Sequence, residues 1–337
     1  MATIREVAAK AGVSAATVSR VLSGDPGFSV RAETRSKINE AVAQLGYEIP
    51  VKRQTRYRFG CVFSDTIDKY SDPFFAEILS AMERACENRN AAIALIRSYP
   101  ELSNPQTLQE FTGAGLDGVF LMEHVSPEIM TALSTHIPHI IFVDKNEPEY
   151  EFDNVGFDHA AANLQVMNAL LQRGYRRIGI ISGSSPKVPL SESIRMVIYR
   201  EALRRAGIPF DEALVKDCSW ELSICEEQTR QLMALPRPPD AIFAGNDSLG
   251  CVVLGTLYAE GYRCPRDVGV IGFNNIDLSS HTVPPLTTID VPTEDIGKAS
   301  VERMIQVIKD KDSSTRRILF PTKLIERKSL TERKALK

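Results

Sequence analysis

Hydroxyl and guanidinium groups gather in a short stretch near the N-terminus of this sequence. Residues 8–22 read Ala-Ala-Lys-Ala-Gly-Val-Ser-Ala-Ala-Thr-Val-Ser-Arg-Val-Leu, in which the valines predict a small core and the residues between them an exposed side. Hydroxyls and backbone amides bind phosphates, an arginine can contact a guanine edge, and alanines can contact thymine methyl groups. The side chains that we expect to contact double-stranded DNA here are Thr3, Ser14, Ala15, Ala16, Thr17, Ser19 and Arg20.

Three helices are needed to position these side chains. Residues 3–6 read Thr-Ile-Arg-Glu, a capping box that predicts a first helix, and Gly12 suits the left-handed residue that ends it. Ser14 can cap a second helix over residues 15–22, and a third is expected over residues 32–45. This order is typical of a helix-turn-helix, whose second helix enters the major groove. An ordinary pair of packed helices is the alternative.

The distribution of charge favours the DNA-binding interpretation. The chain has 337 residues and a net charge of −3, which by itself argues against a nucleic-acid partner. Residues 1–58, however, contain ten Lys/Arg and five Asp/Glu, whereas the rest of the chain has a net charge of −8. A basic head on an acidic body indicates that only the head meets a polyanion.

A basic segment follows the head. Residues 51–58 contain four basic residues and no acid, and we interpret residues 49–58 as a linker. We expect Lys52, Arg53, Arg56 and Arg58 to contact phosphates or a narrow minor groove, as a basic arm. A linker that is merely solvated remains an open alternative, because runs of charge often make no specific contact.

Residues 59–337 alternate between short apolar runs and helical patterns. The predicted strands cover residues 59–64, 91–96, 118–122 and 139–143, and then 177–182, 241–244 and 268–273. The predicted helices include residues 73–90, 160–173, 194–206, 248–260 and 294–309. Such alternation predicts an α/β body of doubly wound parallel sheets, and two series of strands predict two lobes. A cleft at the carboxyl ends of the strands is the expected ligand site. The predicted domains are therefore residues 1–48, 49–58 and 59–337.

Other functional classes find little support in the sequence. It contains no phosphate-binding loop, no HExxH and no GxSxG, and its five histidines lie apart. The six cysteines form no CxxC pair, so we interpret them as reduced core residues and expect neither a metal nor a cofactor. Without a signal peptide or an apolar span, we expect a cytoplasmic protein. The alternatives are a sugar-binding protein and a nucleotide-dependent enzyme with an incidental helical N-terminus.

Several motifs together resemble the lactose/galactose-repressor (LacI/GalR) family of transcriptional regulators. They are residues 3–22, Glu33-Thr-Arg35, Leu45-Gly-Tyr47, Asp72-Pro-Phe-Phe75, Gly174-Tyr-Arg-Arg-Ile-Gly179, Gly245-Asn-Asp247, Val270-Ile-Gly-Phe273 and Pro284-Pro-Leu-Thr-Thr288. The resemblance implies a homodimeric regulator of palindromic operators, most often a repressor of a sugar-utilisation operon. It also implies a body like a periplasmic sugar-binding protein, with a small sugar-like effector, or sometimes a purine, between the lobes.

Carried over position by position, the resemblance also implies a set of effector contacts. They are Ser64, Asp65, Phe74, Phe75, Asp144, Arg195, Trp220, Asn246 and Asn274. Aromatic faces pack on apolar sugar faces, and carboxylates, amides and Arg bind adjacent hydroxyls. Simpler roles remain open: Phe74 and Phe75 as core, Asp144 and Asn246 as caps, and Arg195 as a surface charge.

The sequence departs from the family pattern in three places. Only eleven residues separate Tyr47 from Phe59, without the leucine that relatives insert into the minor groove, so we expect the hinge helix to be absent. Shortened linkers of this kind resemble some galactoside-operon repressors. Asn274 replaces a frequent Asp, and Ile198 precedes Tyr199 where relatives often have Gly. The short segment after Leu330 predicts a dimer without a C-terminal coiled coil.

Overall fold

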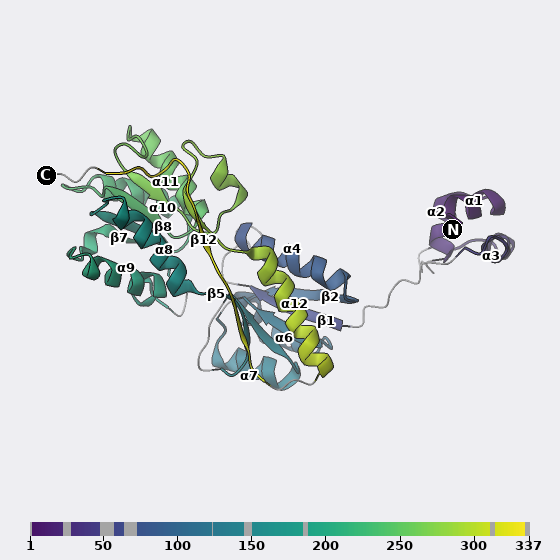
Figure 1. The fold of residues 1–337 in the computed structure, drawn as a ribbon. Helices are drawn as coiled ribbons and strands as arrows, with labels where there is room; N and C mark the ends of the chain where they lie inside the picture. Colours follow the sequence, from purple (N-terminus) through teal and green to yellow (C-terminus); the bar gives the residue numbers. More distant parts are fainter. Residues whose placement is uncertain are drawn as a thin grey trace. The chain divides into compact units, whose positions relative to one another are not determined.

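The computed structural model describes residues 2–22, 28–47, 57–63, 73–122, 124–144, 150–184, 188–310 and 314–333 of the chain (Figure 1). Internal contacts divide it into two units, Met1–Thr55 and Arg56–Lys337. Among the described residues, no helix combines the length and the apolar character needed to span a lipid bilayer.

The N-terminal unit consists of three helices, α1 (Ile4–Ala11), α2 (Ala15–Leu22) and α3 (Ala32–Leu45). All three lie where the sequence predicts them. Their core is small and built around three wholly buried side chains, Val7, Val18 and Ile38.

The ends of α1 and α3 follow from a few local interactions. The Thr3 amide donates to Glu6 Oε2 at 2.7 Å, and the Glu6 amide donates back to the Thr3 hydroxyl, which is the predicted capping box. Gly12 and Gly46 adopt φ values of 69° and 58°, the left-handed conformation that closes a helix at little cost for glycine.

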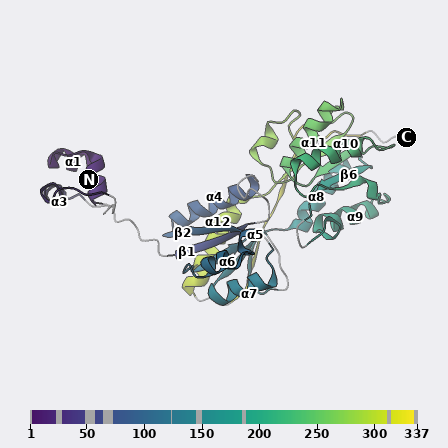
Figure 2. The ribbon, with the colours of Figure 1, turned by 180° about the vertical axis from the view of Figure 1, so that it is seen from behind.

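The first lobe of the body is a six-stranded, wholly parallel sheet in the order β11-β5-β4-β3-β1-β2. Its strands are β1 (Tyr57–Phe63), β2 (Ala91–Ser98), β3 (Gly118–Leu121), β4 (Ile140–Val143), β5 (Asp153–Phe157) and β11 (Arg317–Phe320). Its helices are α4 (Pro73–Glu87), α5 (Tyr99–Leu102), α6 (Pro105–Thr112), α7 (Pro127–His136) and α12 (Thr293–Asp310). Helices α4 and α12 pack side by side on one face, and α6 and α7 cover the other (Figures 1 and 2).

The second lobe is a four-stranded parallel sheet in the order β7-β6-β8-β9. Its strands are β6 (Ile178–Ser182), β7 (Val215–Asp217), β8 (Ala241–Ala244) and β9 (Gly269–Ile271), with β10 (Thr288–Asp290) and β12 (Lys323–Ile325) forming a separate antiparallel pair. Its helices are α8 (His159–Gln172), α9 (Ile194–Arg205), α10 (Leu222–Met233), α11 (Asp247–Ala259) and the short 3₁₀ turns Leu190–Glu192, Glu212–Leu214 and Asp277–Ser280. Helices α8 and α9 pack together, as do α10 and α11.

The chain crosses between the lobes three times. It leaves the first lobe between β5 and α8, returns between β10 and α12, and leaves again between β11 and β12. A buried ion pair joins the returning helix α12 to the sheet of the first lobe: Arg303 Nε lies 3.0 Å from Oδ1 of Asp153 in β5. The sequence patterns do not predict this return, because nothing local to residues 293–320 indicates which sheet they join.

One predicted boundary needs correction. Arg58 was expected in the basic linker, yet β1 already begins at Tyr57. The reason is backbone pairing: the Arg58 amide donates to Asp117 Oδ2 at 2.7 Å, and its carbonyl accepts from the Asp117 amide. Arg58 is thus part of the sheet, although its side chain remains exposed.

Candidate DNA-binding and effector sites

The second helix of the head presents the predicted DNA-contacting side chains. The Ser14 hydroxyl accepts a hydrogen bond from the Thr17 amide at 3.1 Å and lies 2.8 Å from the Thr17 hydroxyl. Ser14 therefore caps α2, as predicted. Ala16, Ser19 and Arg20 are exposed.

Two of the predicted contact residues are less exposed than expected. Ala15 is half-buried and packs against the core of the head, and Thr17 is half-buried beside Ser14. The exposure of these two side chains is reduced because the first turn of α2 packs on α1. Ala15 therefore has a structural role in addition to any contact with DNA.

Arg20 is held at the surface by an aromatic side chain. Its guanidinium carbon lies 5.3 Å from the centre of the Phe28 ring, within the range of a cation–π interaction. Such a contact limits the rotamers of Arg20 before DNA arrives. The predicted linker contacts Lys52, Arg53 and Arg56 lie outside the described residues, as do Ser64 and Asp65 of the predicted effector site.

Arg195 is half-buried in the second lobe, and its Nε atom is fully buried. It is the second residue of α9, which Ser193 caps by accepting from the Met196 amide. Its guanidinium donates to the Ser182 hydroxyl at 2.6 Å and to the Gly245 carbonyl at 3.0 Å. Its Nε has no hydrogen-bond partner among the described residues.

Three aromatic rings surround the Arg195 guanidinium. Its central carbon lies 5.5 Å from the centre of the Trp220 ring, 5.6 Å from that of Phe243 and 5.7 Å from that of Phe273. Burial lowers the pKa of Arg195 to about 10, against the opposing effect of Asp144, so the group remains protonated at neutral pH. An aromatic cage around a fixed cation leaves polar edges for a ligand and excludes bulk water.

Asp144 brings a carboxylate from the first lobe towards this cation. It follows β4, is only 7% exposed, and has a φ of 61°. Its Oδ1 lies 3.1 Å from His159 Nε2 but forms no hydrogen bond of acceptable geometry in the described part of the chain. The predicted capping role is not observed for this side chain, so its carboxylate remains available to a ligand.

Backbone strain coincides with three of the predicted effector residues. Asp144, Trp220 and Asn274 have φ values of 61°, 63° and 101°, a region that non-glycine residues rarely occupy. Strained backbone that the surrounding fold maintains is concentrated at functional sites. The Asn274 amide is fixed by a hydrogen bond to the Ile289 carbonyl at 2.9 Å, which leaves its side chain half-buried.

The other predicted residues divide between structure and surface. Asn246 caps α11, because its Oδ1 accepts from the Leu249 amide at 2.9 Å. Phe74 is 3% exposed and packs in the main apolar core, whereas Phe75 is half-buried and lies edge-on to it, 5.1 Å between ring centres. The core role left open for Phe74 is the one that its burial supports, and a ligand could reach Phe75 more readily.

A pocket of about 570 Å³ lies between the lobes. Pro73 and Glu77 of α4 form one wall, and residues of the second lobe form the other, among them Leu222, Ser248 and Ile276. Each of these three stands two residues after a predicted effector residue, namely Trp220, Asn246 and Asn274. None of the predicted effector residues that the structure describes lines this pocket itself; it lies beside them, at the starts of α10, α11 and the 3₁₀ turn Asp277–Ser280.

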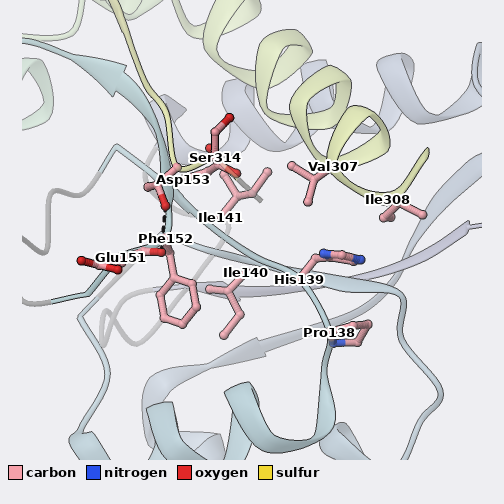
Figure 3. A pocket seen from close by; sticks show the side chains of 11 residues that line it. Pro138, His139, Ile140, Ile141, Glu151, Phe152, Asp153, Val307, Ile308 and Ser314 are labelled. Atoms are coloured by element: carbon pink, nitrogen blue, oxygen red, sulfur yellow. Dashed lines mark hydrogen bonds between the residues drawn. The ribbon is translucent and has the colours of Figure 1, made fainter. Parts of the chain in front are cut away.

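A second pocket, of about 450 Å³, lies in the first lobe at the opposite ends of the strands (Figure 3). It is bounded by His139 and Ile140 at the start of β4, Phe152 before β5, and Val307 and Ile308 near the end of α12. Burial lowers the pKa of His139 there. None of the predicted site residues lines this pocket. No group of three His, Cys, Asp or Glu side chains within the described ranges is arranged to hold a metal ion.

Sequence reasoning missed the residues that position Arg195. Ser182 is the last residue of β6, Phe243 lies within β8, and Phe273 follows β9. A signal existed for Ser182, since it is the polar end of a predicted apolar strand that should face the cleft. The aromatic pair gave no such signal, because a Phe in a buried strand is indistinguishable from ordinary core.

Comparisons with known proteins agree with this architecture. Residues 3–49 match the family described as bacterial regulatory proteins, lacI family, and residues 167–330 match a periplasmic binding protein-like domain. The HTH-type transcriptional repressor CytR of Escherichia coli (strain K12) is 30% identical over 303 residues, or 89% of this chain and 88% of CytR. The HTH-type transcriptional repressor PurR of Photobacterium profundum is 29% identical over 337 residues, or 98% and 99% of the two chains.

Solved structures show the same relationship. A complex of the transcriptional regulator CelR with cellobiose has a TM-score of 0.73 at 29% identity, covering 98% of this chain and all of that one (100%). The chain therefore belongs to the lacI family, and it is a DNA-binding transcriptional repressor of that family. Its relatives are named as repressors rather than enzymes. These findings confirm the predicted family, the helix-turn-helix head and the two-lobed α/β body.

Proposed function

We propose that the protein acts in the cytoplasm to repress an operon for sugar utilisation, under the control of a small sugar-like effector bound between its lobes. The observation that carries this proposal is the buried Nε of the half-buried Arg195, which lacks a hydrogen-bond partner in the described part of the chain. A buried donor without an acceptor is costly, and a ligand hydroxyl would satisfy it. Asp144 supplies the complementary acceptor from the other lobe.

The composition of the site favours a neutral polyol. The charge of Arg195 is already opposed by that of Asp144, so an anionic ligand gains little from it. Trp220 offers an aromatic face, and Asn274 offers both a donor and an acceptor. A ligand that contacts both lobes favours one arrangement of them, which changes the spacing of the two DNA-binding heads of a dimer.

The effector can be identified by thermal-shift measurements on the full-length protein. The probes are cellobiose and ribose, which are bound in solved structures of family members, with purine nucleosides as a contrasting class. A ligand that binds the native state raises the melting temperature by mass action. The effect of that ligand on operator affinity is then measured by fluorescence anisotropy.

Arg195→Ala tests the site itself. We expect the variant to retain operator affinity and to lose both the thermal shift and the change in anisotropy. Arg204→Ala is the control, because Arg204 lies exposed on the same helix in an ion pair with Glu201. A full response in Arg195→Ala would exclude the site. If only a nucleoside raises the melting temperature, and Arg195→Ala abolishes that shift, the proposed location of the effector site is supported. The proposal that the effector is a sugar is then refuted.

The proposed DNA interface combines α2 with the basic arm. Ala16, Ser19 and Arg20 would contact bases and phosphates, and Lys52, Arg53 and Arg56 would add phosphate contacts. Each phosphate contact contributes about 0.9 to the slope of log affinity against log salt. Replacing the three arm residues by Gln should therefore flatten that slope, whereas Arg204→Gln in the body should not. An unchanged slope would exclude the arm.

A homodimer is the assembly that we propose for binding a palindromic operator. The second lobe exposes large apolar side chains that a monomer leaves in water, with Val283 at 89% and Tyr258 at 83% exposure. A C₂ dimer would use one such surface on both copies. Light scattering of the full-length protein should give the dimer mass, and a tetramer would contradict the proposal.

A further inference from the structure

One aromatic side chain of the head lies outside its apolar core. Phe28 precedes α3 and is half-buried, but within the described part of the head it does not pack against the core around Val7, Val18 and Ile38. A phenyl ring stabilises a fold mainly by the large apolar area that it buries in a core. Phe28 does not contribute in this way, so its position calls for another explanation.

The ring of Phe28 lies against Arg20 of α2. The central carbon of the Arg20 guanidinium is 5.3 Å from the centre of the ring. Arg20 stands in the last turn of α2, on the exposed face that also carries Ala16 and Ser19. Val18 points the other way, into the core of the head. The aromatic contact is therefore made on the face of α2 that is proposed to meet DNA.

An arginine that lies over an aromatic ring can still bind a base. A guanidinium is planar, and its five N–H donors point outward in that plane. A ring beneath the plane leaves those donors free, so the same arginine can donate two hydrogen bonds to O6 and N7 of a guanine. A flexible arginine side chain loses conformational entropy when it is fixed on a base. A ring that has already ordered the side chain reduces this loss on binding.

We propose that Phe28 is a positioning residue for DNA recognition, which holds the Arg20 guanidinium in the orientation in which it binds a guanine of the operator. This inference rests on the proposed contact between Arg20 and DNA, and it adds a residue outside α2 to those that determine sequence preference. A cation–π contact at an exposed site changes an equilibrium constant by about 2–5-fold. Loss of the aromatic ring should weaken binding by that factor for each head, and the loss should depend on the guanine.

Selection from random DNA identifies the base that Arg20 contacts. Full-length protein is mixed with a pool of duplexes that share a randomised core, and the bound duplexes are sequenced. The selection is then repeated with Arg20→Met. We expect the natural protein to prefer guanine at one position of each half-site, and Arg20→Met to lose that preference alone. If Arg20→Met selects the same bases, the proposed contact of Arg20 is wrong, and the proposed role of Phe28 is wrong with it.

A double-mutant cycle on the selected duplex tests Phe28, with affinities measured by fluorescence anisotropy. Phe28→Leu keeps an apolar side chain without an aromatic face, and Phe28→Tyr keeps that face. We expect Phe28→Leu to lose about 2–5-fold in affinity for each head, together with the same factor of guanine preference, and Phe28→Tyr to match the natural protein. In Arg20→Met, the further change Phe28→Leu should have no effect, because no guanidinium remains to be held. Equal losses with and without Arg20 would overturn the proposal, as would tighter binding by Phe28→Leu.

A second positive charge of the head provides the matched control for Arg20. Lys37 of α3 is exposed and pairs with Glu33, with 2.7 Å between Nζ and Oε1. Lys37→Met removes the same charge from the head as Arg20→Met does. We expect it to keep the guanine preference, and we expect Phe28→Leu to have its full effect in this variant. If the effect of Phe28→Leu disappears in Lys37→Met as well, the coupling is a general effect of charge and the proposal fails.

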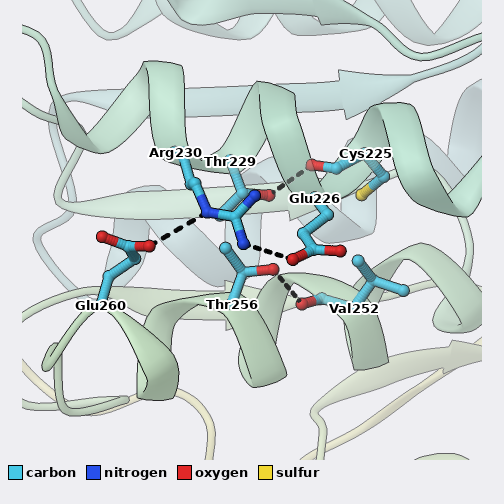
Figure 4. A network of polar contacts seen from close by, with 7 residues as sticks. All are labelled: Cys225, Glu226, Thr229, Arg230, Val252, Thr256 and Glu260. Carbon is cyan, nitrogen blue, oxygen red and sulfur yellow. Dashed lines mark hydrogen bonds and ion pairs between the residues drawn. The ribbon is translucent and has the colours of Figure 1, made fainter.

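A charge of the body provides the second control. Arg230 of α10 pairs with Glu226 on its own helix and with Glu260 at the end of α11, where Nε and Oε1 are 3.0 Å apart (Figure 4). Arg230→Met should leave both the selected bases and the effect of Phe28→Leu unchanged. Circular dichroism checks the helices of each variant. A Phe28→Leu protein whose head unfolds would lose affinity for every base alike, and that result would assign Phe28 a structural role and overturn the proposal.

Discussion

The buried carboxylate of Asp247 makes the stability of the second lobe depend on pH. Asp247 is the first residue of α11 and is wholly buried; its two oxygens accept from the Thr288 hydroxyl at 2.6 Å and the Ile276 amide at 3.0 Å. Burial nevertheless raises its pKa to about 7 from the ordinary 3.8. The native state thus binds a proton more tightly than the unfolded chain does.

The sign and size of the effect follow from this difference. Because the native pKa is the higher one, the contribution to stability is fully present below the unfolded pKa and is lost as the pH rises through about 7. The difference between the native and unfolded pKa of Asp247 corresponds to roughly 4 kcal/mol in the free energy of unfolding. About 2–3 kcal/mol of this is lost between pH 5 and pH 8. Asp247→Asn cannot titrate and should lose this part of the pH dependence.

The assay is urea unfolding at pH 5 and pH 8, followed by the fluorescence of Trp220 in the same lobe. The comparison uses the change between the two pH values, since Asn also loses one acceptor and about 1–2 kcal/mol at either pH. Asp158→Asn is the control: it is an exposed cap at the start of α8, where Asn caps equally well. Equal pH dependence in Asp247→Asn and the natural protein would refute the reasoning.

The packing leads to three further predictions. Arg303→Met should cost about 3–5 kcal/mol in denaturant unfolding, because it leaves the buried Asp153 carboxylate without its counter-charge, although the Arg316 amide still donates to it. Arg84→Met, which breaks an exposed pair, should cost about 0–1 kcal/mol, and equal losses in the two variants would contradict this. Gly183→Ala should shift the emission of Trp220, because the new Cβ would lie 2.4 Å from its ring; an unaltered spectrum would show that the ring is elsewhere. Tyr258→Asp should weaken the proposed dimer by at least tenfold in sedimentation, and an unchanged association would remove this surface from the interface.

Features that depend on residues close together in the chain could be predicted from the sequence. The capping box at Thr3 and the glycines 12 and 46 fixed the ends of the head helices, since each acts within one turn of chain. The strands of the body were predicted to within a few residues wherever an apolar run was flanked by turn residues. Strand β5 was not predicted, because Asp153 and Asn154 make its sequence polar although both side chains are buried.

Contacts between side chains that are distant in the chain could not be predicted in the same way. Arg195 was placed at the site by family resemblance, but the aromatic cage around it depends on three strands that meet only in the folded sheet. The left-handed backbone at Trp220 had no signal either, since tryptophan rarely adopts it, and the tolerance of Asp for this region is too general to predict it at Asp144. Phe74 was predicted as an effector contact, but it is 3% exposed and packs in the core. The sequence alone does not distinguish a core aromatic residue near a cleft from one that contacts a ligand.

The three crossings between the lobes impose an order on synthesis. The head is a continuous segment, complete once its third helix leaves the ribosome. The sheet of the second lobe is complete after β9, whereas the first lobe, begun at β1, lacks its edge strand until β11 is made near the C-terminus. A nascent chain therefore carries a finished DNA-binding head while its regulatory body is still open. Truncation before β11 would leave the sheet of the first lobe without its edge strand but would not alter the head, so the fragment could bind DNA without control by a ligand.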